Sequence, residues 1–200
     1  MSEYGENYEH YRGVIERRNR PSRRLYDTYR HILPVLGIVR PHEKVLDLGC
    51  GIGEVGHDLR LLGVETTSID ISPSAHSLGR KVFGQENRHF RVVGNVQKLP
   101  FMDESFKTVV SYDLFEHLYP AEMEEVLSEV ERVISGSKIF IKLTPVEDKQ
   151  NIDADLSHVT KWTEEQWKLW FEEHGWRTLR NPTRKFMGKK NHGNYLLEKV

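Results

Sequence analysis

The stretch Val45-Leu46-Asp47-Leu48-Gly49-Cys50-Gly51-Ile52-Gly53-Glu54-Val55-Gly56 decides the fold of this 200-residue chain. Val45, Leu46 and Leu48 make a short apolar run that predicts a strand buried on both faces. Three glycines in the next five positions let the backbone approach a ligand without Cβ atoms in the way. Apolar residues three and four positions apart then predict a helix, and Gly63 lies where a left-handed C-terminal cap belongs.

Two classes of cofactor use a strand, a glycine-rich turn and a helix in this order. The run Gly51-Ile-Gly53-Glu-Val-Gly56 satisfies the G-x-G-x-x-G pattern of dinucleotide binders, which place a pyrophosphate at the helix N-terminus. Here that position is flanked by Asp47 and Glu54, whose negative charges would oppose two phosphates. S-adenosylmethionine (SAM) carries a sulfonium, an ammonium and no phosphate, so acidic residues beside the turn favour SAM.

The run Asp47-Leu-Gly49-Cys-Gly51-Ile-Gly53 resembles the first motif of the class I SAM-dependent methyltransferases. The later stretches that carry the resemblance, in order, are Asp70, Gly94-Asn95 with Leu99-Pro-Phe101, Glu116-His117 and the loop at Pro145. The resemblance covers residues 43–200 and implies an α/β fold. That fold is a doubly wound, mostly parallel seven-stranded sheet with an antiparallel last strand and helices on both faces. It also implies a single domain over residues 1–200, with 1–40 as an N-terminal helical cap and 43–200 as a Rossmann-like core.

The cofactor site is predicted at the ends of the first three strands. A β-branched run ends in Asp70, and a carboxylate at the end of a second strand can accept hydrogen bonds from both ribose hydroxyls. The resemblance places the adenine amino group beside Asn95, where relatives usually have Asp, and an amide oxygen can still accept from it. The predicted cofactor-binding residues are Asp47, Gly49, Cys50, Gly51, Gly53, Asp70, Ile71, Asn95, Val96 and Tyr112.

The catalytic residues are expected after the fourth predicted strand, because ligands lie at the carboxyl ends of parallel strands. Asp113, Glu116 and His117 follow that strand and are the candidates for chemistry. His117 could act as the base if the acceptor is protonated. The alternative for Glu116 and His117 is a cap and packing pair on a short helix.

A divalent metal is a further hypothesis. Asp113, Glu116, His117 and the distant His158 resemble the ligand set of metal-dependent O-methyltransferases, in which a Glu stands at the position of Asp113. Two oxygens and two imidazoles with open positions would suit Mg²⁺, Mn²⁺ or Zn²⁺. The alternative for His158 is a loop histidine that packs near Trp162.

The composition indicates a soluble globular protein in the cytoplasm. The chain is 38% hydrophobic and 30% charged with a net charge of −1, and it has no apolar run long enough to cross a membrane. The N-terminus is acidic and polar, so no secretory signal is expected. The single cysteine, Cys50, excludes an internal disulfide, and its place inside the turn favours a small packing residue over a nucleophile.

The predicted function is methyl transfer to a small-molecule acceptor, at an oxygen such as that of a phenol, sugar or acid. An RNA- or protein-directed methyltransferase, including metal-dependent 2′-O-methylation, is an alternative because the N-terminal segment is rich in arginine. These arginines are Arg12, Arg17, Arg18, Arg20, Arg23 and Arg24. A third alternative is a SAM-binding partner protein without catalysis. The polar residues 147–157 are expected to form a mobile lid, and the sequence indicates neither the acceptor nor the oligomeric state.

Overall fold

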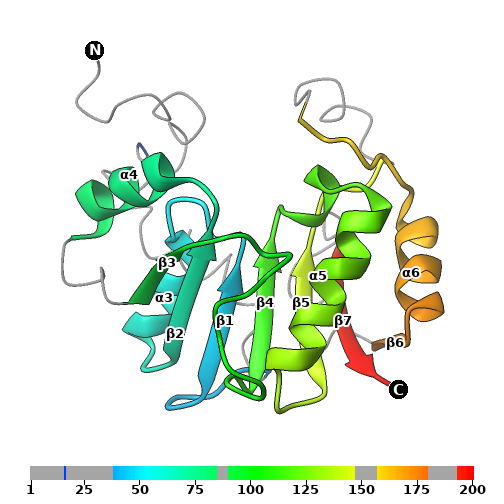
Figure 1. The fold of residues 1–200 in the computed structure, drawn as a ribbon, viewed down its shortest axis with the longest axis horizontal. Helices are drawn as coiled ribbons and strands as arrows, with labels where there is room; N and C mark the ends of the chain where they lie inside the picture. The colour runs from blue at the N-terminus through cyan, green and yellow to red at the C-terminus, as the bar shows by residue number, and fades with distance from the viewer. Residues whose placement is uncertain (1–15, 17–37, 85–89, 147–156, 180–192) are drawn as a thin grey trace.

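The computed structural model describes residues 16, 38–84, 90–146, 157–179 and 193–200 (Figure 1). Within these ranges, a seven-stranded sheet has the order β3-β2-β1-β4-β5-β7-β6. The strands are β1 (Lys44–Leu48), β2 (Glu65–Asp70), β3 (Arg91–Val93), β4 (Thr108–Tyr112), β5 (Lys138–Lys142), β6 (Trp176–Leu179) and β7 (Asn194–Lys199). Only β7 pairs antiparallel with its neighbours, β5 and β6, and the remaining pairings are parallel. The predicted mostly parallel sheet with an antiparallel last strand is confirmed.

Helices cover both faces of the sheet, as a doubly wound fold requires. The helices are α3 (Glu54–Leu61), α4 (Pro73–Phe83), the short 3₁₀ helix η2 (Phe115–His117), α5 (Pro120–Val133) and α6 (Glu164–Glu173). Apolar residues of α5 and α6 share one core cluster, and those of α3 belong to a second cluster on the opposite face. Helix α5 begins at Pro120, a residue suited to the first helical position because it needs no N–H partner there.

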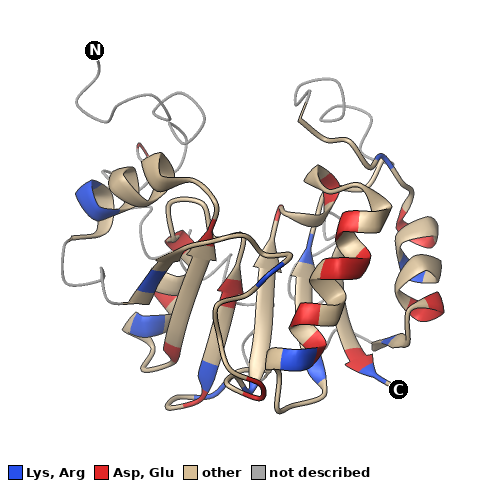
Figure 2. Ribbon diagram, in the orientation of Figure 1, with Lys and Arg blue, Asp and Glu red and all other residues tan. Residues whose placement is uncertain are grey.

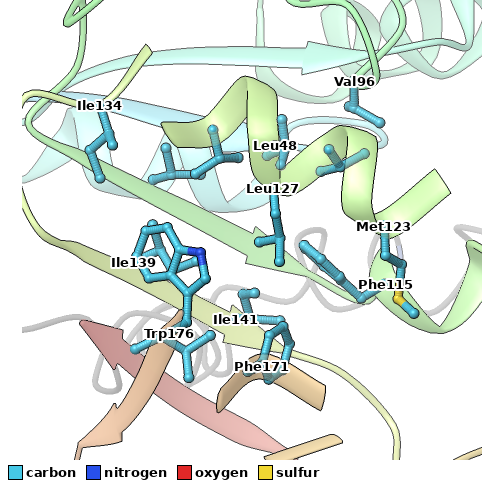
Figure 3. Packing of buried hydrophobic residues seen from close by; sticks show 14 of the residues in the cluster. Leu48, Val96, Phe115, Met123, Leu127, Ile134, Ile139, Ile141, Phe171 and Trp176 are labelled. Atoms are coloured by element: carbon cyan, nitrogen blue, oxygen red, sulfur yellow. The ribbon is translucent and has the colours of Figure 1, made fainter. Parts of the chain in front are cut away.

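The central strands are apolar on both faces, which is why their sequences read as continuous hydrophobic runs. In β1, Leu46 and Leu48 point into the α5 and α6 cluster, whereas Val45 belongs to the α3 cluster. In β5, Ile139 and Ile141 likewise face α5 and α6, and Phe140 faces the other way. Figure 3 shows the larger cluster, in which side chains from α5, the central strands and the C-terminal part of the chain meet. Because β1, β2, β4 and β5 run parallel, their carboxyl ends meet at one edge of the sheet (Figure 1).

Several predictions on peripheral segments concern residues beyond those described. The N-terminal cap over 1–40 falls there apart from residues 16 and 38–40, as does nearly all of the proposed lid at 147–157. These assignments, and the single domain over 1–200, stay predictions. Among the described helices, none has the length and apolar character needed to cross a membrane.

Candidate functional site

The glycine-rich turn after β1 depends on left-handed backbone. Gly49, Gly51 and Gly53 have φ angles of 69°, 53° and 80°, a region that residues with a Cβ rarely adopt. The turn is tied to the end of β2 because the Cys50 N–H donates to the Ile69 carbonyl oxygen at 2.9 Å. Burial raises the pKa of the Cys50 thiol well above its usual value. Cys50 therefore stays a neutral thiol, which fits the packing role that the sequence indicates.

The side chain of Asp47 connects the segments around this turn through hydrogen bonds. Its Oδ2 accepts hydrogen bonds from the Gly56 N–H at 3.0 Å and from the Ser68 hydroxyl at 3.1 Å. The side chain is buried, and burial raises the pKa of its carboxyl to about 6, although its hydrogen bonds and the nearby Arg60 act in the opposite direction. Asp47 thus links β1 to α3 and β2, and its contact with a cofactor stays a prediction.

Gly56 is needed for that link, a role that its place in the glycine pattern does not reveal. A Cβ at this position would lie 2.1 Å from Ser68 Oγ and 2.9 Å from Asp47 Oδ2. The first turn of α3 can approach β2 this closely only because residue 56 has no side chain. The requirement follows from three-dimensional packing rather than from contact with a ligand.

Asp70 stands at the carboxyl end of β2, beside the turn. Its Oδ2 accepts from the Gly51 N–H at 2.8 Å, and its Oδ1 accepts from the Ser72 N–H at 2.9 Å. Each carboxylate oxygen can accept more than one hydrogen bond, so this carboxylate can also receive ribose hydroxyls. The next side chain, Ile71, is 68% exposed and offers an apolar surface beside the carboxylate.

Asn95 and Val96 follow β3 and lie close to β2 along the same edge. The Gly94 N–H donates to the Asp70 carbonyl oxygen at 3.0 Å, which brings the two strand ends together. The Asn95 amide oxygen accepts from the Gln97 N–H at 2.9 Å, in a local turn, while the Val96 side chain is buried. The structure therefore gathers these residues beside Asp70, and their contact with adenine stays a prediction.

The second half of the edge lies at the ends of β4 and β5. Tyr112 is the last residue of β4, and Asp113 follows it. Burial raises the pKa of the Tyr112 phenol well above its usual value, so the phenol stays neutral. Asp113 has a φ of 51°, uncommon for a residue other than glycine, and its N–H donates to the Lys142 carbonyl oxygen at 2.7 Å. Its carboxylate also pairs with the Lys142 ammonium group. The end of β4 is thus fixed to the end of β5, with a charged pair at the surface.

Glu116 lies in the core beneath this half, with no exposed surface. Its Oε1 accepts from the Thr144 N–H at 2.9 Å, and its Oε2 has no hydrogen-bond partner in the described part of the chain. Burial, with a smaller effect from the Asp113 charge, raises the pKa of the Glu116 carboxyl to about 8. The carboxyl is therefore mainly protonated at neutral pH and points into the protein rather than toward a ligand.

His117 follows directly and faces the loop at residue 157. Its Nδ1 lies 3.2 Å from the Ser157 carbonyl oxygen and 3.0 Å from Ser157 Oγ. A carbonyl oxygen only accepts, so this contact favours the tautomer with the proton on Nδ1 and the lone pair on Nε2. The His158 ring packs edge-on against the His117 ring, with 4.7 Å between the ring centroids.

The four proposed metal ligands do not form one donor set. Glu116 is buried and bonded to Thr144, and Asp113 pairs with Lys142, so only the two imidazoles adjoin each other. Among the described residues, no group of three or more His, Cys, Asp or Glu side chains is placed to hold a metal ion. These residues do not fit the metal that the sequence raised as a hypothesis.

Residues that sequence reasoning missed complete the half of the edge at the ends of β4 and β5. Lys142 and Thr144 bind the carboxylates of Asp113 and Glu116, and Ser157 contacts His117. The one available signal was the place of Lys142 and Thr144 at the end of a predicted strand, since such ends meet at the ligand edge. Ser157 gave no signal, because it follows a polar stretch of irregular sequence.

The chain is similar in sequence to known methyltransferases. The family described as a methyltransferase domain matches residues 45–136. The sterol 4-C-methyltransferase strm-1 of Caenorhabditis elegans is 33% identical over 99 residues, which are 48% of this chain and 29% of that protein. The uncharacterized methyltransferase sll0829 of Synechocystis is 32% identical over 111 residues, 55% of this chain and 51% of that protein. The chain thus spans about half or less of the length of these curated relatives.

Solved structures share the fold at low sequence identity. The PH0226 protein of Pyrococcus horikoshii is 22% identical with a TM-score of 0.69, and the match covers 96% of this chain and 99% of that one. Phosphoethanolamine N-methyltransferase 1 of Haemonchus contortus was solved with phosphoethanolamine and S-adenosylhomocysteine. It is 18% identical with a TM-score of 0.63, over 86% of this chain and 42% of that one. At these identities the likeness shows the fold alone.

Proposed function

This chain carries a class I SAM-dependent methyltransferase domain, and from that premise we propose that it transfers a methyl group from SAM to a small, polar acceptor, at oxygen. The observation that carries the proposal is the arrangement of Asp70 beside the glycine turn. Its carboxylate orders the Gly51 and Ser72 N–H groups and keeps lone pairs for two hydroxyls. Asp47 and Glu54 add negative charge near the turn, which suits a cofactor with cationic groups and no phosphate.

When bound, SAM supplies a methyl group on a sulfonium, which is already a strong electrophile. The chain therefore needs to align the acceptor and exclude water more than to supply covalent help. The cofactor half of the edge, from β1 to β3, holds the residues proposed to bind SAM apart from Tyr112, which ends β4. The acceptor half, at the ends of β4 and β5, carries the residues proposed to meet the acceptor.

We assign His117 the role of base for an acceptor hydroxyl. Its Nδ1 is next to the Ser157 carbonyl oxygen, which favours a proton on Nδ1 and leaves Nε2 to meet the acceptor hydroxyl. Such a nitrogen can take the proton of a hydroxyl group as the methyl group is transferred. Glu116 leaves the catalytic set in this proposal, because its carboxyl is buried and faces the core.

The acceptor half favours a polar substrate. The charged pair of Asp113 and Lys142, together with His117, gives this half ionisable groups rather than an apolar surface. Several curated relatives are sterol C-methyltransferases, whose acceptors are largely apolar. The charged groups at this edge support an acceptor of a different kind, with hydroxyl or carboxyl groups.

The alternative of an RNA-directed enzyme finds little support in the described residues. Figure 2 shows acidic residues along α5, which would repel a phosphate backbone. The sequence of the helix places Glu122, Glu125 and Glu129 among them. The arginine-rich segment lies outside the description and leaves this alternative to experiment. A cytoplasmic location stays a prediction.

The test is methyl transfer itself. The purified protein is incubated with SAM labelled in its methyl group and a panel of catechols, phenolic acids, sugars, a sterol and bulk RNA. We expect label in a hydroxylated small molecule and its loss with His117→Ala, while SAM affinity is retained. Transfer to the sterol or to RNA alone would contradict the proposed acceptor, and SAM binding without transfer would favour a non-catalytic partner protein.

A further inference from the structure

We propose that Glu116 is a positioning residue that fixes the loops of the acceptor half and, through them, His117, without touching the substrate. This inference rests on the proposed methyl transfer and deepens it, because it names what holds the proposed base in place. Glu116 has no exposed surface, so its carboxyl is available to the protein's own backbone and not to an acceptor.

The side chain of Glu116 joins η2 to the loop that follows β5. Its Oε1 accepts from the Thr144 N–H at 2.9 Å. Thr144 is the second residue after β5, where the chain has left the sheet and ladder hydrogen bonds no longer fix its backbone. The hydrogen bond is partly buried, where an N–H group without a partner is costly, and Glu116 supplies the partner from another segment of the chain.

The main chain of Glu116 binds a third segment. Its carbonyl oxygen accepts from the Val159 N–H at 2.9 Å and the Thr160 N–H at 3.1 Å. The Thr160 hydroxyl in turn donates to the Leu118 carbonyl oxygen at 2.5 Å. One residue therefore joins η2 to the loop after β5 with its side chain and to residues 159–160 with its backbone.

The segments around Glu116 also contact one another. The Val146 N–H donates to the Trp162 carbonyl oxygen at 2.9 Å, which links the loop after β5 to the segment that precedes α6. Ser157, at the start of that segment, contacts His117 Nδ1. Without the Glu116 carboxyl, the Thr144 N–H loses its partner, the loop can move away from η2, and the imidazole loses its fixed surroundings.

The charges near Glu116 belong to Asp113 and Lys142, which pair with each other. Neither replaces the Glu116 carboxyl as an acceptor for Thr144. A neutral amide at position 116 has the same shape as the acid and keeps one acceptor oxygen. A methionine fills a similar volume and keeps no strong acceptor. These two substitutions separate the hydrogen bond from the packing.

The experiment compares wild-type protein with Glu116→Gln and Glu116→Met. Hydrogen exchange is measured at the Thr144 amide, and the His117 ring is followed by its imidazole NMR signals. For Glu116→Met we expect exchange at Thr144 to accelerate about tenfold or more, because an unmade buried hydrogen bond costs on the order of one factor of ten. The His117 signals should shift in the same variant. Glu116→Gln should resemble wild type in both measurements.

Methyl transfer gives the functional readout. Glu116→Met should lower kcat about tenfold or more, because misplacing a reacting group slows the chemical step, while SAM affinity stays within about twofold of wild type. Glu116→Gln should restore most of kcat. The matched control is Glu122→Met, which removes another carboxylate that holds a backbone N–H, that of Tyr119 at 2.8 Å, but lies at the exposed start of α5. The control should change neither Thr144 exchange nor the His117 signals.

Unchanged Thr144 exchange and His117 signals in Glu116→Met would overturn the inference. So would a Glu116→Gln variant that loses transfer as fully as the methionine variant while both structural readouts stay normal, because Glu116 would then act on the substrate itself. If wild-type protein binds SAM but methylates nothing, the proposed function fails. The exchange and NMR measurements then still decide whether Glu116 positions these loops.

Discussion

The cofactor half and the acceptor half of the sheet edge are built around carboxyl groups in different ways. On the cofactor half, every group that Asp47 or Asp70 holds lies within 21 positions of it in the sequence. Asp47 accepts from Gly56, nine positions away, and Asp70 accepts from Gly51, 19 positions away. On the acceptor half, Glu116 accepts from Thr144, 28 positions away.

The difference has a physical consequence for each half. On the cofactor half, Asp47, Asp70 and the groups they hold all lie in one continuous stretch of the chain, residues 47–72. The acceptor half needs three separate segments to meet, and each meeting depends on the packing of α5 and α6 on the sheet. Substrate specificity can therefore change in the acceptor half without disturbing the cofactor half.

The largest effect is expected from filling the space at Gly56. Gly56→Val would place side-chain atoms where Ser68 Oγ and Asp47 Oδ2 now lie, so α3 must move away from β2. We expect SAM affinity to fall at least about 100-fold and stability to fall by about 1–3 kcal/mol or more, as for other overpacked sites. Calorimetry and chemical denaturation measure the two effects.

The matched control for that substitution is Gly175→Ala. Gly175 has a φ of 81°, and a Cβ there would meet nothing within 4 Å. This variant should lose about 1–2 kcal/mol of stability from backbone strain and keep its SAM affinity. Equal losses of SAM affinity in both variants would show that any strained glycine disturbs the site, which would remove the special role of Gly56.

The pH dependence of stability separates the two buried carboxyls. Both have pKa values raised in the folded protein, Asp47 to about 6 and Glu116 to about 8, from 3.8 and 4.5. An acid with a raised folded pKa stabilises the protein fully below its unfolded pKa, and that stabilisation is lost as pH rises through the folded pKa. Asp47 therefore loses its contribution to stability between about pH 4 and 6, and Glu116 loses its contribution between about pH 4.5 and 8.

Between pH 6 and 8, Glu116 is the one of these two carboxyls whose contribution to stability still falls as pH rises. Here wild-type stability should fall by up to about 1.4 kcal/mol per pH unit relative to Glu116→Gln, which has no carboxyl to ionise. Asp47→Asn should alter the slope only below about pH 6. Denaturation curves at half-unit steps of pH test this, and a slope above pH 6 that is the same in wild type and Glu116→Gln would place the Glu116 pKa elsewhere.

These particulars show what the sequence could reveal. The turn and the place of Asp70 at a strand end were predictable, because glycine spacing and apolar runs are local signals, and the mostly parallel sheet followed from the family resemblance. The sequence predicted Asp47 as a cofactor-binding residue. It did not predict the hydrogen bonds that Asp47 accepts from Gly56 and Ser68, because these require α3 to pack on β2. Glu116 was predicted as a catalytic residue because it follows the fourth strand. Its position in the sequence does not reveal that its side chain is buried.

A smaller effect is expected at Asp70. Asp70→Ala should weaken SAM binding by roughly 1.5 to 3 kcal/mol, the range for a charge-assisted hydrogen bond. Asp103→Ala is the control, because Asp103 is an exposed acid that pairs with Arg132, away from the turn. Titration calorimetry of both variants is the measurement, and equal affinities for Asp70→Ala and wild type would remove Asp70 from the cofactor site.

The smallest effect is expected from removing metal ions. Glu116 faces the core and Asp113 is paired with Lys142, so a chelator should leave methyl transfer and SAM affinity unchanged. Transfer rates are compared before and after EDTA treatment and after adding back Mg²⁺, Mn²⁺ or Zn²⁺. A loss that one of these ions restores would mean that the acceptor half rearranges to bind metal.

The central claim is that the glycine turn and Asp70 form a SAM site, and competition between cofactors tests it most directly. The purified protein is titrated by calorimetry with SAM, S-adenosylhomocysteine and NAD⁺, beside the Asp70→Ala variant. We expect saturable binding of SAM and S-adenosylhomocysteine, no binding of NAD⁺, and weaker binding of SAM by the variant. Tight binding of NAD⁺ with none of SAM would contradict the account.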